Sequence, residues 1–330
     1  MDSNSTEISA EIMVSICCIT YNQEAYIRDA LDGFLKQKTK FKWELLIHDD
    51  ASTDRTAEII REYAERYSDR IFPILQTQNQ YSQGLTNISG TFNFPRARGK
   101  YIAMCEGDDY WTDETKLERQ VEFMEAHPGC SLCLHSARVE VQGRALTEHM
   151  MRPYRKSRKI RPEEIIDKTS GYPTASLMFR RSMVEKLPDF YVKAPIADIP
   201  LQLMSAQRGW AYYMDRPMCV YRLGGAQSWT TLMKQGNYEE KQKKYAREME
   251  AMYRGFDQES KERFHQTVER AIARIHFLTW VNTRRYEKIL DRKYRCFYRE
   301  LNLRTRFFIR FEKIAPGFYA MLQRQFHREG

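Results

Sequence analysis

The chain lacks any apolar run long enough to cross a membrane. A spanning helix needs about 20 consecutive apolar residues, and no stretch of the 330 residues approaches that length. The first residues, MDSNSTEISAEIM, have neither the basic start nor the apolar core of a secretory signal peptide. We therefore expect a cytoplasmic protein.

Cysteine is scarce, and its seven copies are an odd number. Cys17 and Cys18 are adjacent, and most of the others lie in apolar runs, which is typical of reduced core residues rather than a disulfide framework. Cys130 and Cys133 form a CxxC pair, but no second cysteine pair or histidine cluster completes a zinc site. Neither disulfides nor zinc are expected.

Charge is missing from one segment and concentrated in another. Residues 71–95 contain no charged side chain, and the polar stretch 76–95 predicts a mobile loop. Residues 231–330 carry 23 Lys and Arg against 13 Asp and Glu, a net of +10, whereas the first 230 residues carry 30 against 31. The basic excess therefore belongs to the C-terminal region, where it favours an anionic partner.

Apolar runs of strand length alternate with segments of helical periodicity, which predicts an α/β fold with a mainly parallel sheet flanked by helices. The strands are expected at residues 14–20, 43–48, 71–75, 101–105, 131–139, 172–179, 210–214 and 218–222. The helices are expected at residues 24–37, 54–67, 113–127 and 196–207. Residues 138–159 read as basic and irregular.

The composition changes near residues 233–236. The sequence beyond is rich in charge and has helical periodicity at 238–253, 261–280 and 284–311. This change predicts two domains, an α/β domain over residues 1–235 and a basic α-helical extension over residues 236–330. Basic and aromatic residues mix in the extension, which suits an anionic membrane surface. The alternative is a helical face whose aromatic side chains pack on the first domain.

Acidic residues follow two of the predicted strands, as Asp49-Asp50 and as Glu106-Gly107-Asp108-Asp109. Residues that follow parallel strands gather at one edge of the sheet, where ligands bind. Adjacent carboxylates repel one another, and Mg²⁺ or Mn²⁺ relieves that repulsion. The competing interpretation is that the acidic residues after residue 48 only cap the next helix.

Three segments together resemble family 2 glycosyltransferases, the inverting, nucleotide-sugar-dependent enzymes with the GT-A fold. The segments are VSICCITYNQEAYIRDALDGFLKQ, ELLIHDDASTDRTAEII and ARGKYIAMCEGDDYWTDETKLERQVEFMEAHP. Their order and spacing carry the resemblance, which covers about residues 14–229 and does not reach the helical extension. It implies a GT-A-like fold.

The resemblance implies a donor site at the ends of the first, second and fourth strands. Thr20, Tyr21 and Asn22 would line the nucleotide pocket, and Asp50 would hydrogen-bond the base. The basic stretch before the fourth strand places Arg98 near the diphosphate, with a solvated turn as the alternative.

The acidic motif after the fourth strand matches the family's metal site. The resemblance implies that Asp108 and Asp109 hold Mn²⁺ or Mg²⁺, with Asp108 also reaching the donor. Glu106 stands where the commoner residue is aspartate. Many relatives carry a histidine shortly after the Tyr-Arg pair that begins at Tyr221, and none occurs here before Trp229.

Asp198 aligns with the family's general base, which takes the proton of the acceptor hydroxyl. It could instead cap the helix that it opens, with Pro200 at an early-turn position. Trp111 and Trp229 fall at predicted site loops and could stack on the acceptor sugar, although large aromatic side chains are more often core residues.

These features predict a metal-dependent inverting glycosyltransferase of the hexosyltransferase type. A UDP-sugar is the expected donor, and a lipid-linked glycan of a surface polysaccharide is the expected acceptor, with the protein peripheral on the inner face of the cell membrane. The alternatives are a nucleotidyltransferase, which would favour a glycine-rich loop after the first strand, and a degenerate scaffold or nucleic-acid-binding protein on the same fold. No nucleic-acid partner is expected.

Overall fold

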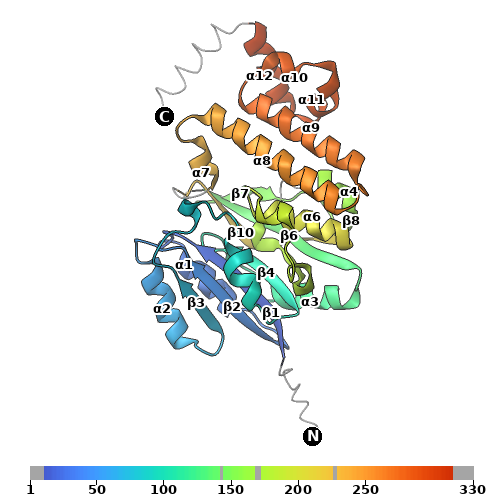
Figure 1. Cartoon of the computed structure of the whole chain (residues 1–330). Coiled ribbons are helices and arrows are strands. Elements are labelled where there is room, and N and C mark those ends of the chain that lie inside the picture. Colours follow the sequence, from blue (N-terminus) through green and yellow to red (C-terminus); the bar gives the residue numbers. More distant parts are fainter. Residues whose placement is uncertain (1–10, 142–143, 168–171, 226–228, 315–330) are drawn as a thin grey trace.

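A mixed sheet with helices on both faces forms the body of the protein, and a group of helices follows it (Figure 1). The computed structural model describes residues 11–141, 144–167, 172–225 and 229–314. In the part described, ten strands are hydrogen-bonded in the path β3-β2-β1-β4-β9-β6-β10-β5, with β7 on β6 and β8 on β10. The predicted fold, a GT-A-like mainly parallel sheet followed by a helical region, is confirmed.

The first half of the sheet is parallel and was predicted by its apolar runs. Its strands are β1 (Ile12–Thr20), β2 (Lys42–Asp49), β3 (Ile71–Leu75) and β4 (Tyr101–Glu106), connected through helices α1 (Ile27–Leu35) and α2 (Thr56–Arg66). Cys17 packs in the core on one face of the sheet and Cys18 in the core on the other. Both faces are therefore covered, which explains the continuous apolar runs.

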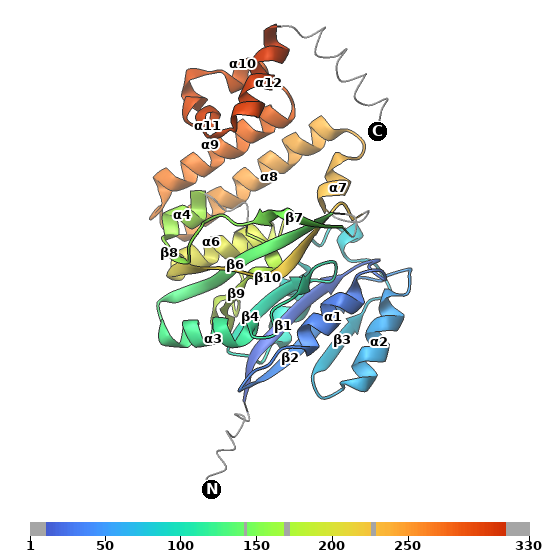
Figure 2. The same ribbon diagram turned by 180° about the vertical axis from the view of Figure 1, so that it is seen from behind.

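The second half of the sheet is mixed. β9 (Met178–Arg180) runs antiparallel between β4 and β6 (Cys130–Val141), and β10 (Trp210–Leu223) lies parallel to β6. The remaining strands are β5 (Tyr110–Trp111), β7 (Arg144–Met151) and β8 (Arg158–Ile160). The helices are α3 (Lys116–Ala126), α4 (Pro162–Asp167), α5 (Asp189–Val192) and α6 (Asp198–Arg208). Figure 2 shows α3 on the opposite side of this half from α6.

Three expectations for this half were wrong. The strand expected at 172–179 is largely replaced by the turn η4 (Thr174–Ser176), and β9 begins only at Met178. Residues 138–159 are not irregular, because β6 extends to Val141 and β7 and β8 follow it. The strands expected at 210–214 and 218–222 are one strand, β10, whose pairing with β6 shifts register between Met214 and Cys219. Pro217, which has no N–H to donate, lies within that irregularity. The continuous pairing partner, β6, keeps the two pieces in one strand.

The polar stretch 76–95 is built of short turns rather than one open loop. It contains η1 (Tyr81–Gln83), η2 (Ser89–Asn93) and η3 (Phe94–Arg96). Asn93 is buried and its Nδ2 donates to the carbonyl oxygen of Cys18 at 3.0 Å. Its uncharged polar side chains therefore serve to satisfy buried backbone groups. Single turns also occur at η4 (Thr174–Ser176), η5 (Arg181–Met183) and η6 (Arg292–Tyr294).

The helical region begins with α7 (Trp229–Lys234), α8 (Tyr238–Glu259) and α9 (His265–Asn282). The helix expected over 284–311 is broken into α10 (Tyr286–Ile289), α11 (Arg295–Glu300) and α12 (Leu303–Ile314). Side chains of α8 and the first half of α9 belong to the same core as α4, α6 and the sheet, whereas the end of α9 and α10 to α12 share a separate cluster. The boundary after residue 235 stays a prediction.

No helix in the described ranges is long and apolar enough to span a membrane. Six of the seven cysteines are buried free thiols, and Cys296 is exposed. Burial raises the pKa of the Cys130 thiol to about 11. The interpretation of these cysteines as reduced core residues agrees with their position.

Lys116 is a charged side chain enclosed in the core between α3 and the sheet. It has no exposed surface. Its Nζ donates to Oε1 of Gln120 at 2.9 Å and lies 3.9 Å from the centroid of the Trp111 ring. Because burial disfavours the ammonium form, the pKa of Lys116 falls from 10.5 to about 8.

We expect Lys116→Met to raise the free energy of unfolding near neutral pH by about 1–3 kcal/mol, the cost of keeping an ammonium group in the core. Because burial lowers the pKa of Lys116, its ammonium form destabilises the folded protein at pH values below the folded pKa. This destabilisation disappears as the pH rises from about 8 toward 10.5. The gain should therefore shrink at alkaline pH in urea unfolding. The same change at the exposed Lys36 is the control, and a gain independent of pH would contradict the assignment.

Candidate functional site

Four carboxylates meet at the carboxyl edge of the parallel strands. Glu106 ends β4 and is paired in register with Ile19 near the end of β1. Loss of water contact and the negative charges of Asp108 and Asp198 raise the pKa of Glu106 to about 8. Asp198, at the start of α6, is therefore close enough to share one electrostatic environment with the residues after β4. Its own pKa is raised by burial.

Asp109 is the most enclosed of the four. It is 1% exposed, and burial together with the charges of Asp108 and Glu106 raises its pKa well above the ordinary value. Its Oδ1 accepts the backbone N–H of Arg222 at 2.8 Å, whereas its Oδ2 is buried with no hydrogen-bond partner. An unpartnered buried oxygen among mutually repelling carboxylates fits a bound divalent cation.

The protein alone supplies few ligands for such a cation. Within the described ranges, no group of three or more histidine, cysteine, aspartate or glutamate side chains is arranged to hold a metal ion. Magnesium-type sites commonly use one or two carboxylates and take their other ligands from water and phosphate. Asp108 and Asp109 fit that pattern, in which the donor's phosphates complete the coordination.

Arg222 of β10 is the cation next to this cluster. Its Nη1 donates to the carbonyl oxygen of Asp108 at 3.1 Å, and its Nη2 donates to Oδ2 of Asp29 at 2.5 Å. The guanidinium lies over the rings of Tyr26 and Tyr110, 4.9 and 4.4 Å from their centroids. Its charge opposes the rise in the pKa of Asp108 that burial causes. Sequence reasoning noted Arg222 only as part of a Tyr-Arg pair and missed this role.

Thr20, Tyr21 and Asn22 lie at the end of β1, at the same edge of the sheet. Asn22 has a positive φ of 52°, and its Oδ1 accepts the backbone N–H of Thr53 at 2.8 Å. Thr20 Oγ1 donates to Oε1 of Gln23 at 2.7 Å. The left-handed residue, stabilised by the side-chain bond, turns the chain sharply after β1. The predicted nucleotide segment is thus a fixed turn.

Asp50 is buried after β2, and its carboxylate is engaged by the chain itself. Oδ1 accepts the backbone N–H of Gln80 at 2.9 Å and Oδ2 that of Tyr81 at 3.0 Å. Nε2 of His48 lies 3.3 Å from Oδ1. Asp50 therefore anchors the 76–95 segment at the site edge, and its predicted contact with the donor base would use the remaining lone pairs.

Asp49, which ends β2, and Asp54, which follows the strand, have local structural roles. Asp49 Oδ2 accepts the backbone N–H of Ser52 at 3.1 Å. Asp54 accepts backbone N–H groups from Thr56 at 2.9 Å and Glu24 at 3.0 Å. The capping interpretation therefore describes Asp54, at the start of α2.

The structure does not bring Arg98 to the site, which corrects its expected role in donor binding. Arg98 precedes β4 and lies at the amino ends of the strands, where its Nε donates to Oε2 of Glu44 at 2.7 Å. Ser15, near the start of β1, also donates to Glu44, at 2.7 Å. In parallel strands the amino and carboxyl ends lie at opposite edges, so Arg98 is separated from Glu106 by the length of β4.

Trp111 is also corrected, because it is 3% exposed and cannot stack on an acceptor sugar. Its indole Nε1 donates to the carbonyl oxygen of Ala175 at 2.9 Å, and its ring meets Phe34 edge to face at 4.7 Å. It is a core residue. Trp229 begins α7, but its side chain lies outside the described part of the chain, so its acceptor role stays a prediction.

Two tyrosines from other elements lie within electrostatic range of Asp198. Burial and the carboxylates of Glu106, Asp108, Asp109 and Asp198 raise the pKa of Tyr221 on β10. Burial and the charge of Asp198 likewise raise the pKa of Tyr245 on α8. Helix α8 of the C-terminal region therefore approaches the candidate base, a contribution that no motif in the sequence signalled.

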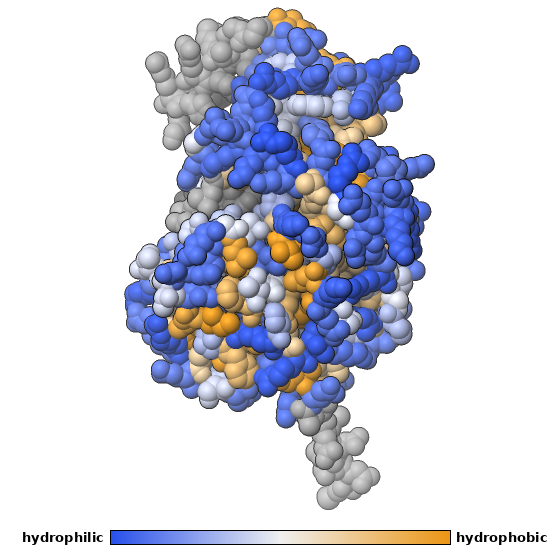
Figure 3. Space-filling model, viewed as in Figure 1, coloured by the Kyte–Doolittle hydropathy of each residue, from blue (hydrophilic) through white to orange (hydrophobic). Residues whose placement is uncertain are grey.

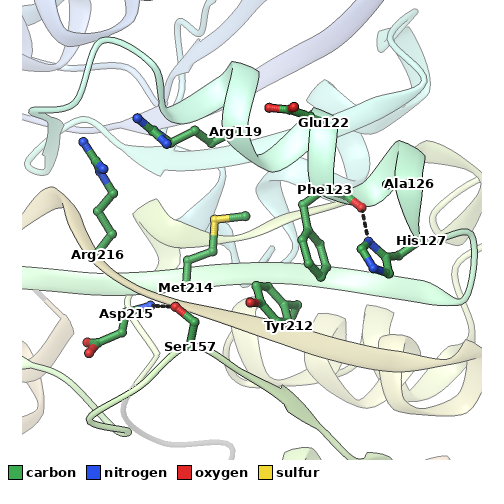
Figure 4. A pocket seen from close by; sticks show the side chains of 10 residues that line it. All are labelled: Arg119, Glu122, Phe123, Ala126, His127, Ser157, Tyr212, Met214, Asp215 and Arg216. Atoms are coloured by element: carbon green, nitrogen blue, oxygen red, sulfur yellow. Dashed lines mark hydrogen bonds between the residues drawn. The ribbon is translucent and has the colours of Figure 1, made fainter.

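A separate groove of about 570 Å³ lies between α3 and β10 (Figure 4). Phe123 and Tyr212 stack there with ring centroids 3.7 Å apart, and His127 Nδ1 lies 2.8 Å from the carbonyl oxygen of Phe123. None of the residues that line this groove belongs to the carboxylate cluster. The chemistry at the sheet edge, and not the size of this groove, therefore identifies the candidate site.

The sheet, the acidic edge and the carboxylate on α6 are the features of a nucleotide-sugar-binding GT-A fold. The family model described as "Glycosyl transferase family 2" matches residues 15–188, just over half of the chain. The chain therefore belongs to glycosyl transferase family 2, as its motifs indicated.

Curated relatives match over a shorter region. An uncharacterized protein of Mycobacterium tuberculosis is 51% identical over 130 residues, which are 38% of this chain and 35% of that protein. The Escherichia coli UDP-Glc:alpha-D-GlcNAc-diphosphoundecaprenol beta-1,3-glucosyltransferase WfgD is 35% identical over 114 residues, 34% of this chain and 42% of that enzyme. The matches thus span well under half the length of these relatives.

Solved structures match over most of the chain at low identity, which establishes the fold alone. Staphylococcus aureus TarS in complex with UDP-GlcNAc aligns with a TM-score of 0.53 and 15% identity, covering 84% of this chain and 88% of that one. A mannosyltransferase from Pyrobaculum calidifontis, in complex with GDP-Man and Mn²⁺, aligns with a TM-score of 0.52 and 15% identity, covering 84% and 75%.

We expect Asp108→Asn to lose most of the thermal stabilisation that UDP and Mn²⁺ together give the wild type. Ligand at 100 times its dissociation constant stabilises a protein by about 2.7 kcal/mol, which a melting curve resolves. Without ligand, the variant should be at least as stable as the wild type, because one of several crowded negative charges is removed.

The matched control is Asp69→Asn, an exposed aspartate paired only with its neighbour Arg70. It should respond to UDP and Mn²⁺ like the wild type. An Asp108→Asn protein that is stabilised to the same extent as the wild type would place the cation elsewhere.

Proposed function

We propose that the protein is an inverting glycosyltransferase that moves a sugar from a nucleotide-diphosphate donor, a UDP-sugar, to a hydroxyl group of a glycan acceptor. The observation that carries this proposal is the shared environment of Glu106, Asp108, Asp109 and Asp198 at one edge of the sheet. Glu106 ends β4, Asp108 and Asp109 follow it, and Asp198 opens a separate helix. This arrangement suits an enzyme in which the residues at the end of β4 bind the donor and a single residue on α6 acts on the acceptor.

On the donor side, the fixed turn of Thr20, Tyr21 and Asn22 and the buried Asp50 would hold the nucleoside. Asp108 and Asp109 would hold Mn²⁺ or Mg²⁺, which when bound neutralises negative charge on the leaving diphosphate. The unpartnered Oδ2 of Asp109 supports this assignment. The Pyrobaculum calidifontis mannosyltransferase, which shares the fold, was solved in complex with Mn²⁺, and this supports the choice of cation.

On the acceptor side, Asp198 would act as the general base. A sugar hydroxyl must lose its proton as it attacks the anomeric carbon from the face opposite the diphosphate, and a positioned carboxylate accepts that proton. Burial raises the pKa of Asp198, so its carboxylate is a better proton acceptor than an exposed one, provided it remains ionised. The opposite-face attack gives inversion.

The acceptor class is inferred from relatives. The Escherichia coli relative is named for a diphosphoundecaprenol-linked acceptor, and a Bacillus subtilis relative, 36% identical over 112 residues, is named as a putative teichuronic acid biosynthesis glycosyltransferase. Transfer to a lipid-linked glycan in surface polysaccharide assembly is consistent with both names. Such an enzyme would work in the cytoplasm at the inner face of the cell membrane.

A thermal-shift panel tests the donor. UDP-sugars with Mn²⁺ or Mg²⁺ should raise the melting temperature, and GDP- and dTDP-sugars should raise it less. Chelation of the metal with EDTA should remove the shift. A shift that survives EDTA, or one confined to GDP-sugars, would contradict the metal or the base assignment respectively.

We expect Asp198→Asn to leave the UDP-sugar shift nearly unchanged and to slow sugar transfer by about 10²–10⁴-fold, since a base acts on the acceptor. Transfer is measured as UDP release in the presence of a lipid-linked glycan. The matched control is Asp189→Asn, an aspartate on α5 that is 89% exposed and should keep full activity. If Asp198→Asn lost donor affinity as much as turnover, the residue would belong to the donor side.

A further inference from the structure

Helix α12 exposes an apolar surface at the outer end of the helical region. Leu303, Phe307 and Ile314 are 77%, 61% and 82% exposed, whereas no other large hydrophobic residue in the described ranges is more than 47% exposed. Their spacings of four and seven residues place them along one side of the helix. Figure 3 shows hydrophobic side chains at this end of the molecule.

The opposite side of α12 holds the helix on the protein. Ile309 is 6% exposed and belongs to the cluster that joins α9, α10 and α11. Tyr298 Oη donates to the carbonyl oxygen of Arg306 at 3.1 Å. The helix is thus fixed by one side and presents the other, so the exposed residues are not simply the surface of an unattached segment.

Positive charge flanks the apolar side. Of the residues in α12, Arg304, Arg306, Arg310 and Lys313 are basic, and no ion pair among the described residues involves any of them. The single acidic residue, Glu312, is paired with Arg284 at 3.1 Å. Across residues 284–314 there are 11 Lys and Arg against 4 Asp and Glu, a net of +7. An occupant of this surface must therefore be both apolar and anionic.

A basic groove lies in the same helical region. It measures about 400 Å³, lies between α8 and α9, and contains Trp280. Arg247 and Lys288 line the groove without an ion pair among the described residues. Lys288 is on α10, whose Ile289 is buried in the same cluster as Ile309 of α12. The unpaired charges of the groove and of α12 therefore belong to one end of the molecule.

We propose that α12 docks on an anionic lipid bilayer. Leu303, Phe307 and Ile314 enter the boundary between headgroups and acyl chains, while the arginines and Lys313 stay at the headgroup level. A bilayer offers apolar depth and negative charge together, whereas a second copy of this chain would bring another net charge of +7 to the contact. The docking concerns a surface distinct from the carboxylate site, so it can be tested without donor or acceptor.

The test is co-sedimentation of the full chain with vesicles. Vesicles of phosphatidylcholine and phosphatidylglycerol in equal parts should bind the protein, and vesicles of phosphatidylcholine alone should not. Binding should fall as salt shortens the screening length from about 10 Å at 0.1 M toward about 3 Å at 1 M. A full chain that ignores the anionic vesicles would overturn the proposal.

Two variants separate the apolar contribution from the charge. Leu303→Ser combined with Phe307→Ser should weaken vesicle binding by about tenfold or more, because two exposed apolar side chains that the bilayer would bury are lost. Val192→Ser, at an apolar residue on α5 that is 46% exposed, is the matched control and should bind like the wild type. Wild-type binding by the double variant would overturn the role of α12.

Arg304→Gln combined with Lys313→Gln should weaken vesicle binding by about fivefold for each charge removed. If the serine variant fails to fold, this variant tests the role of α12 in its place. Arg61→Gln, at an exposed arginine on α2, is its control. Analytical ultracentrifugation tests the other candidate for this surface, a second copy of the chain. A dimer that the serine variant loses, with no vesicle binding by the wild type, would assign the surface to a second copy of the chain and overturn the proposal.

Discussion

Repulsion among the carboxylates that follow β4 is the constraint on which the site depends. Asp109 is buried next to Asp108 and Glu106, and one residue of another strand, Arg222, donates to this segment. Arg222 provides a backbone N–H to Asp109 and a guanidinium to the carbonyl oxygen of Asp108. Because Arg222 lies near the end of β10, the second half of the sheet holds the acidic edge of the first half in place.

The parts of the structure set by local pattern could be predicted from the sequence. The apolar runs of β1 to β4 and the carboxylates after them follow from a sheet that is covered on both faces. Arg98 was misplaced because its donor role rested on the resemblance of the basic stretch before the fourth strand, and not on a position in the sheet. It precedes β4 whereas Glu106 ends it, and in a parallel sheet those positions lie at opposite edges.

The features that could not be predicted from the sequence depend on contacts between distant segments. Trp111 lies in β5, a two-residue strand that exists only by pairing with β10, so no periodicity could reveal it or its burial. The role of Arg222 depends on the register of β10 against β6 beyond an irregularity near Pro217. The 76–95 segment is held by backbone N–H groups of Gln80 and Tyr81 that donate to Asp50, and by the Asn93 side chain that donates to the backbone of β1. These are tertiary relations that a local pattern cannot contain.

Different helices of the C-terminal region pack in different places. Met249 and Phe256 of α8 are buried in the same core as the strands and α6, and Tyr245 approaches Asp198. Helix α8 thus lies near the proposed general base. Helices α10 to α12 share an apolar cluster with the end of α9. Glu300 of α11 is also paired with Arg274 of α9, which in turn is paired with Asp167 of α4. A lipid-linked acceptor would need both properties, a fixed base beside the reacting hydroxyl and a separate contact with the membrane that holds its lipid.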